Sequence, residues 1–239
     1  FAKRKKLMFG AVFQNRFNLP VMFAKKIIQQ NKLGKISGFS VSLIWCRTQN
    51  YYSDEWHGTW KMDGGVTSQQ AIHHLDAINW LVGPIQEVNA IKTNAINKLE
   101  AEDTLVGILK NESGVLGTFQ ATTAARPVDL KAEIMIIGSK GSIVIDGIAL
   151  NNLGEINLKN FKRLNKKKYS QKVPSGYGLG HISFMKKVIK ALQNGKSILP
   201  PIDPRESLYV QKIIHALYLS SEKKKWIKVK DKNSYKRLG

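Results

Sequence analysis

Alternation of apolar and polar residues constrains this sequence more strongly than any other feature. From Ile36 to Trp45 apolar side chains alternate with serines, and this period of two is typical of a strand with one buried face. Further strand-like segments follow between residues 85 and 150, where turn signals lie at Asn111–Gly114 and Gly138–Gly141. We therefore predict a sheet that is mainly antiparallel.

Helix signals flank the predicted strands. A chain with runs of strands and with helices toward its ends is typical of an α+β fold, here an open sheet with helices on one face. We predict a buried strand over Leu7–Phe17 and a last strand over Trp226–Val229. The predicted helices are Asn18 to Gly34, Gly65 to Leu81, His181–Gln193 and Asp203–Ser221. Between the strands and the last two helices, Asn151–Gly180 is predicted to be a weakly structured surface segment.

The net charge of the chain limits the classes of molecule that it is expected to bind. Among 239 residues, 38 are Lys or Arg and 17 are Asp or Glu, which gives a formal net charge of +21. Such a charge suits nucleic acid, an anionic membrane surface or an anionic small substrate. The lysines are scattered, and the runs Lys166–Lys168 and Lys223–Lys225 have no interleaved aromatic residues, so a solvated surface is favoured over nucleic-acid binding.

Cysteine and hydropathy patterns exclude several classes of protein. Cys46 is the only cysteine, so neither a disulfide framework nor a multi-cysteine zinc site is possible. No apolar run reaches the roughly 18 residues that a membrane-spanning helix needs. His73 and His74 are adjacent and would point to different faces of a helix, and no H-E-x-x-H motif occurs. We expect a cytoplasmic protein with no metal site and no membrane partner.

The predicted helix from Gly65 to Leu81 carries the first candidate site. Gln69 and His73 are four residues apart, so a helix would place them on one face. A histidine beside a polar side chain suits general acid and base catalysis, because imidazole exchanges a proton near neutral pH. The alternative is a hydrogen-bonded histidine in the core.

Two further groups of residues are candidates for binding. The loop after Trp45 contains Arg47, Tyr52, Trp56 and His57, and such aromatic and cationic side chains can stack on rings or hold carboxylate and phosphate oxygens. A well-packed aromatic loop without a ligand is the alternative.

The second group, Asn15 and Arg16, ends the first predicted strand, where sites in α/β proteins commonly lie. The sequence contains neither a G-x-G-x-x-G motif after a strand nor a P-loop, so it has no fingerprint for nucleotide phosphates.

Several of these motifs together resemble a known family. In chain order they are Gly10–Asn18, Trp45–Tyr52, Trp56–Gly65, Gln70–Asp76, Glu102–Thr104 and Ile137–Gly141. The ordered set resembles the Gfo/Idh/MocA family of oxidoreductases, and within it the UDP-N-acetylglucosaminuronate 3-dehydrogenases.

The resemblance implies a domain organisation. Family members have an N-terminal Rossmann domain and a catalytic lysine, followed by an α+β domain whose sheet faces a partner subunit. By this resemblance, residues 1–20 are the end of a dinucleotide-binding domain that is mostly absent, and they include its last strand. Residues 21–239 are the substrate-binding and oligomerisation domain, and we expect a homo-oligomer that forms through the sheet face.

The resemblance also implies roles for single residues. His73 falls on the catalytic histidine of the family, and Gln69 stands where many members have Asp. Trp56 and His57 stand where relatives often have Trp-Arg near the cofactor, which is NAD or NADP. The implied substrate-side residues are Asn15, Arg16, Arg47 and Tyr52.

The implied reaction is oxidation of a secondary alcohol of a sugar. We expect the substrate to be an anionic nucleotide sugar, oxidised at C3 of a UDP-linked N-acetylated uronic acid. Two alternatives stay open: the same family chemistry on a free sugar or inositol, and a non-catalytic basic domain for binding or oligomerisation.

Overall fold

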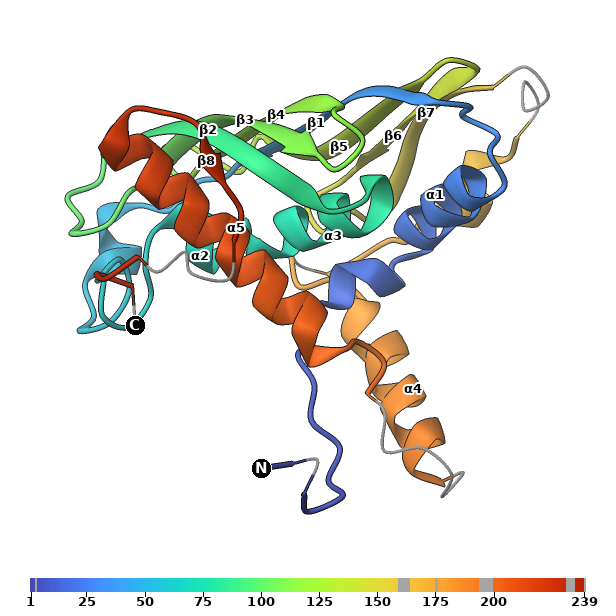
Figure 1. The fold of residues 1–239 in the computed structure, drawn as a ribbon, viewed down its shortest axis with the longest axis horizontal. Coiled ribbons are helices and arrows are strands. Elements are labelled where there is room, and N and C mark those ends of the chain that lie inside the picture. The colour runs from blue at the N-terminus through green and yellow to red at the C-terminus, as the bar shows by residue number, and fades with distance from the viewer. Residues whose placement is uncertain (3, 159–163, 175, 194–199, 231–234, 239) are drawn as a thin grey trace.

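The fold is an open eight-stranded sheet with helices packed on one face (Figure 1). The computed structural model describes residues 1–2, 4–158, 164–174, 176–193, 200–230 and 235–238. The strands are β1 (Ile36–Ile44), β2 (Ile85–Thr93), β3 (Thr104–Asn111), β4 (Leu116–Thr122), β5 (Lys131–Gly138), β6 (Gly141–Asp146), β7 (Asn152–Leu158) and β8 (Ile227–Lys228). They are arranged in the order β7-β6-β5-β1-β4-β3-β2-β8.

The helices lie between and after the strands. The α-helices are α1 (Leu19–Gln29), α2 (Val66–Gln69), α3 (Ile72–Val82), α4 (Gly180–Gln193) and α5 (Pro204–Lys223), and the 3₁₀ turns are η1 (Gln14–Phe17), η2 (Gln49–Tyr52) and η3 (Lys166–Tyr169). The helix α5 packs along β2, α3 lies against β1, and α4 projects away from the sheet (Figure 1). The predicted α+β class and the helices on one face are confirmed.

The strand β1 confirms the alternation predicted from the sequence. Phe39, Val41 and Leu43 are buried toward the helices, and the serines between them face the other side of the sheet. Its neighbours differ in direction, because β5 pairs with it antiparallel and β4 pairs with it parallel. The other neighbouring strands pair antiparallel, so the prediction of a mainly antiparallel sheet is confirmed.

Turn and helix-cap signals in the sequence predicted the positions of several elements correctly. The two predicted turns connect β3 to β4 and β5 to β6. The helix α4 occupies the predicted residues, and α5 begins at its predicted cap, where the Asp203 carboxylate accepts a hydrogen bond from the Arg205 backbone N–H at 2.8 Å. The helix α1 begins after Asn18 as predicted but ends at Gln29, and Gly34 lies in a left-handed turn before β1.

Two predictions of secondary structure are wrong. Residues 7–13 form no strand, and Leu7 and Phe9 are 54% and 64% exposed, because no described segment pairs with them. The surface segment after residue 151 contains the edge strand β7 and the turn η3, since Leu153 and Leu158 are buried and give β7 an apolar face.

The predicted helix from Gly65 to Leu81 is divided into α2 and α3. The Ala71 N–H bonds to the carbonyl of Val66, five residues back, which makes a wide turn around Gln70. Gln69 and His73 therefore lie in two different helices rather than in the single helix that the sequence predicts.

The core lies between the sheet and the helices. Its largest fully buried side chains include Tyr218 of α5 and Phe119 of β4. Across the described residues, no helix combines the length and the apolar character that crossing a membrane would require.

Gly117 of β4 provides a test of this packing. It pairs with Phe39, and a Cβ at residue 117 would lie 2.2 Å from the Phe39 ring. We expect Gly117→Ala to lower the free energy of unfolding by about 1–3 kcal/mol through overpacking, measured by urea denaturation. The matched control is Gly38→Ala on β1, where the nearest atom to an added Cβ is 3.8 Å away. Equal effects of the two substitutions would contradict the predicted packing.

Candidate active site

The two histidines at the start of α3 lie in apolar surroundings. The His73 ring meets the Phe13 ring edge to face at a centroid distance of 5.8 Å, and its Nδ1 has no partner among the described residues. Burial, reinforced by the charge of His181, lowers the pKa of His73 to about 4. His73 is therefore neutral at neutral pH, the state in which an imidazole can accept a proton.

His74 is more deeply buried than His73. It is 2% exposed, and its ring lies 6.2 Å from the Trp45 ring. Burial and the neighbouring His73 lower its pKa to about 3. His74 is a buried, neutral residue, but neither of its ring nitrogens has a hydrogen-bond partner among the described residues, so it is not the hydrogen-bonded core histidine that the sequence left open as an alternative.

Gln69 contacts a tyrosine rather than His73. Its Nε2 donates a hydrogen bond to the Tyr51 hydroxyl at 2.8 Å. The Tyr51 ring packs against Tyr52 at 5.0 Å and against His57 at 4.3 Å. Tyr51 thus connects α2 to the aromatic loop, and it is a residue that the sequence analysis did not select. Its position inside the matched motif Trp45–Tyr52 was the available signal.

Trp56 and His57 form a stacked pair. Their rings are 3.5 Å apart with an interplanar angle of 30°, and Trp56 is 40% exposed. The His57 Nδ1 lies 2.5 Å from an Asp54 carboxylate oxygen, which orients the imidazole. The pair therefore presents a flat aromatic surface near Tyr51, and such a surface suits stacking against a planar ring.

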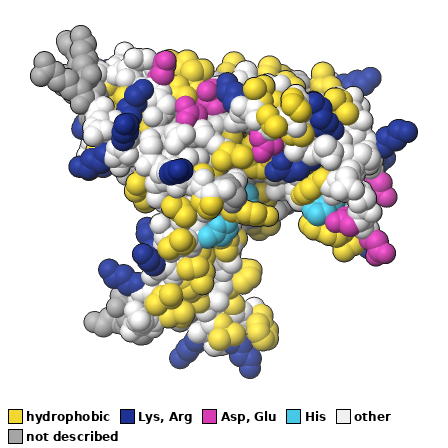
Figure 2. Space-filling model, turned by 180° about the vertical axis from the view of Figure 1, so that it is seen from behind, with side chains coloured by type: hydrophobic (Ala, Val, Ile, Leu, Met, Phe, Trp, Pro, Cys, Tyr) yellow, Lys and Arg dark blue, Asp and Glu magenta, His cyan; other side chains and the backbone are white. Residues whose placement is uncertain are grey.

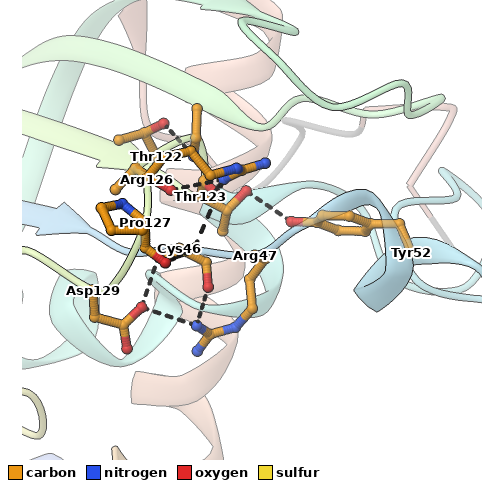
Figure 3. A network of polar contacts seen from close by, with 10 residues as sticks. Cys46, Arg47, Tyr52, Thr122, Thr123, Arg126, Pro127 and Asp129 are labelled. Atoms are coloured by element: carbon orange, nitrogen blue, oxygen red, sulfur yellow. Dashed lines mark hydrogen bonds and ion pairs between the residues drawn. The ribbon is translucent and has the colours of Figure 1, made fainter.

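Arg47 and Tyr52 lie where the parallel pair of strands ends (Figure 3). The Arg47 guanidinium donates to Asp129 at 3.1 Å and to the Cys46 carbonyl at 2.7 Å, and it lies over the Trp45 ring at 5.0 Å. The Tyr52 hydroxyl is 2.7 Å from the Thr123 hydroxyl, and burial raises the pKa of Tyr52 to about 12. Tyr52 is therefore a neutral hydroxyl at neutral pH.

A cavity adjoins this group. It has a volume of about 290 Å³ and is lined by Trp45, Asp129, Lys131, Asp146 and Ile148, among others. The Trp45 indole N–H is buried and has no partner among the described residues.

Arg16 is surrounded by carboxylates. It is 5% exposed and donates two hydrogen bonds to Asp76, at 2.7 Å and 2.6 Å, and one to Glu206. This arrangement occupies the guanidinium, so we leave Arg16 out of the proposed substrate site. Asn15 is 3% exposed, its Oδ1 lies 3.4 Å from the Asn18 amide, and its predicted role in binding substrate stays a prediction.

The comparisons with known proteins agree with the fold and with the motifs. The family model described as the oxidoreductase family C-terminal alpha/beta domain (GFO_IDH_MocA_C) matches residues 25–229. The chain belongs to the Gfo/Idh/MocA oxidoreductase family. No curated protein matches the chain significantly.

Solved structures extend the comparison. The WlbA dehydrogenase of Bordetella pertussis, solved with NADH and UDP-GlcNAcA, is 31% identical with a TM-score of 0.85 over 95% of this chain and 66% of that chain. The WlbA dehydrogenase of Chromobacterium violaceum, with the same ligands, has the same identity and TM-score over 98% and 66%. A levoglucosan dehydrogenase with NADH and levoglucosan, 21% identical with a TM-score of 0.74 over 93% and 66%, shares the fold. The chain thus spans 66% of the length of each of these structures.

Some neighbours of the site in this Gfo/Idh/MocA chain had no sequence signal. Asp129 contacts Arg47 across a separation of 82 residues, and nothing in the local sequence marks that pair. Arg126 donates to the Thr123 and Ala125 carbonyls at 3.2 Å and 2.7 Å, on the other side of Cys46 (Figure 3). Among the residues described, no cluster of three His, Cys, Asp or Glu side chains could hold a metal ion.

The Arg16 ion pair gives a prediction about stability. Arg16→Met would leave Asp76, which is fully buried, without its cation, so we expect a loss of about 3–5 kcal/mol in the free energy of unfolding at pH 7. Burial already raises the pKa of Asp76 to about 6, so Asp76 can take up a proton and the loss should shrink toward pH 5. Urea denaturation at both pH values measures the effect.

The control for this prediction is an exposed ion pair. Arg205 and Asp203 lie at the surface at the start of α5, so Arg205→Met should leave the unfolding midpoint nearly unchanged. A loss for Arg16→Met that is as small, or that grows toward pH 5, would contradict the role of the buried pair.

Proposed function

We propose that the chain is the substrate-binding part of an NAD(P)-dependent sugar dehydrogenase. The observation that carries the proposal is the buried His73 at the start of α3, which is neutral at neutral pH and whose Nδ1 has no hydrogen-bond partner among the described residues. The resemblance to the family suggests His73 as the catalytic histidine. The membership in the family and the two WlbA structures with NADH and UDP-GlcNAcA support this reaction class.

The described residues could contact one part of an NAD(P) cofactor, its planar ring, but not its pyrophosphate. The exposed face of the stacked Trp56 and His57 rings suits contact with a planar cofactor ring. No glycine-rich phosphate loop follows a strand in the described part of the chain, so these residues do not suit the pyrophosphate. When bound, NAD would accept a hydride.

The residues of this chain would accept the hydroxyl proton and bind the substrate. His73 accepts the hydroxyl proton at its ring nitrogen, for which the imidazole has to be neutral, as it is at neutral pH. Gln69 acts through Tyr51, which holds the aromatic loop close to α2. Arg47 presents positive charge beside the cavity, and an Arg guanidinium matches the carboxylate or phosphate oxygens of an anionic nucleotide sugar.

The proposed substrate is, more specifically, a UDP-linked N-acetylated uronic acid that is oxidised at C3. Asn15 and Tyr52 are proposed as further residues that contact this substrate. The net charge of +21 suits such an anion. The similarity to proteins solved with UDP-GlcNAcA favours it over a free sugar or inositol.

The protein would further contain a dinucleotide-binding domain, to which residues 1–20 belong, whereas residues 21–239 would form the domain that binds substrate and oligomerises. An apolar stripe on α4 supports this organisation, since Ile182, Met185, Ile189 and Leu192 are each about half exposed. Figure 2 shows hydrophobic side chains gathered along this projecting arm. A packed domain would cover such a surface.

We further propose a homo-oligomer formed through the sheet face, located in the cytoplasm and binding no nucleic acid. Ile91, Val106 and Ile108 are 75%, 51% and 42% exposed on the face opposite the helices. No described segment of this chain covers them, and an exposed apolar sheet face favours self-association.

His73 provides the test of the reaction. His73→Ala in the protein expressed from its own gene should abolish turnover of UDP-GlcNAcA with NAD, followed as NADH absorbance, because the proton acceptor is lost. The adjacent His74→Leu is the matched control, since His74 is buried and should tolerate an apolar residue without loss of turnover. Wild-type turnover by His73→Ala, with an unchanged melting temperature, would contradict the assignment.

Arg47 tests the class of substrate. Loss of a charge-assisted contact is worth about 1.5–3 kcal/mol, so Arg47→Met should raise KM for the UDP-linked uronate at least tenfold. The same variant should change KM for an uncharged sugar less than twofold. Steady-state kinetics on both substrates measure this difference, and an equal effect on the two would favour the free-sugar alternative.

A further inference from the structure

Glu102 is a buried carboxyl at the junction of three elements. It is 2% exposed and precedes β3. Its Oε1 accepts hydrogen bonds from the Thr67 backbone N–H of α2 at 3.1 Å and from the Tyr218 hydroxyl of α5 at 3.0 Å. Its Oε2 has no partner among the described residues. A buried carboxyl with one unpartnered oxygen is costly, so its presence here requires an explanation.

Glu102 also contacts the turn that begins α2. The Val66 N–H donates to the Glu102 carbonyl at 3.0 Å, and the Gly65 N–H donates to the Tyr218 hydroxyl at 3.3 Å. A Cβ at residue 65 would lie 2.1 Å from Glu102 Oε2. Three successive residues at the start of α2 are therefore in contact with Glu102 or with its partner Tyr218.

The turn anchored in this way leads directly into the candidate site. The helix α2 is only four residues long and ends at Gln69, which bonds to Tyr51. The Ala71 N–H bonds back to the Val66 carbonyl, and His73 is the second residue of α3. A displacement at the first turn of α2 would thus reach both site residues through a short, hydrogen-bonded connection.

We propose that Glu102 is a positioning residue for the dehydrogenase reaction, holding α2 so that Gln69 and His73 keep their places. This inference rests on the proposed function. The ionised carboxylate is the holding form, because a charged acceptor binds the Thr67 N–H and the Tyr218 hydroxyl more strongly than a neutral carboxyl does. Protonation of Glu102 loosens the start of α2.

The surroundings of Glu102 set the pH range of this effect. Burial raises the pKa of Glu102 to about 7, opposed by the hydrogen bonds from Thr67 and Tyr218. The ionisable groups packed nearby are Lys92 of β2, whose ammonium lies over the Tyr218 ring at 5.9 Å, together with Tyr218 and Tyr235. The adjacent Asp103 makes its own hydrogen bonds to the backbone N–H groups of residues 95–97.

The kinetic test uses Glu102→Gln in the protein expressed from its own gene. The amide keeps the shape and one acceptor oxygen but cannot ionise. We expect the ratio of variant to wild-type kcat to fall roughly tenfold between pH 6 and pH 8, with KM for the nucleotide sugar changing less than twofold. In this ratio, the effects on kcat of all other ionisations that the two proteins share cancel.

Two further variants complete the kinetic test. Tyr218→Phe removes the donor on α5 and should lower kcat in the same direction. Glu222→Gln is the matched control, because the Glu222 carboxylate also accepts a hydrogen bond from a tyrosine, Tyr235 at 2.6 Å, but forms no hydrogen bond with α2 among the described residues. Its kcat ratio should not vary with pH. A Glu102→Gln variant with wild-type kcat from pH 6 to pH 8 would overturn the proposal, even if its melting temperature fell.

A second measurement needs no variant and no turnover. In wild-type protein, NMR titration of the Thr67 backbone amide reports the ionisation of Glu102, and the Gln69 side-chain amide should shift with the same midpoint near pH 7. A Gln69 amide that does not follow Thr67 would overturn the proposal. Absence of sugar oxidation by the wild-type protein would contradict the proposed function instead, while this titration would still test the coupling.

Discussion

The buried ion pair between Arg16 and Asp76 connects parts of the chain on which the candidate site depends. Arg16 belongs to η1, and Asp76 lies one turn after His73 on α3. Glu206 brings the first turn of α5 to the same guanidinium. Because each buried charge needs the other, the pair specifies how η1, α3 and α5 meet more precisely than apolar contacts alone would.

Local signals in the sequence predicted some elements and not others. The alternation in β1 and the cap at Asp203 depend on neighbours in sequence, so they were predicted correctly. The segment Leu7–Phe17 has the apolar residues of a strand, but a strand requires a partner, and no described segment provides one. The helix α2, which ends just before Gln70, is bonded at its start to Glu102, and helical periodicity does not report such a contact between residues distant in the sequence.

In the candidate site too, the residue types could be predicted from the sequence, whereas their contact partners could not. Gln69 and His73 could be selected because their residue types and motif point to proton transfer, but the partner of Gln69 is Tyr51, from a loop 18 residues earlier. Arg16 and Arg47 have the same residue type and looked equally suited to an anion. Their carboxylate neighbours distinguish them, because Arg16 is enclosed by two carboxylates whereas Arg47 contacts one and adjoins a cavity.

The net charge and the buried histidines belong to one electrostatic arrangement. In a chain with 38 basic and 17 acidic residues, Asp129 is paired with Arg47 and Asp76 is paired with Arg16. No carboxylate among the described residues pairs with His73, so burial and the nearby His181 act unopposed and keep the imidazole neutral. Charge in this part of the chain is thus held in ion pairs, and the His73 imidazole lies outside them as a neutral polar group.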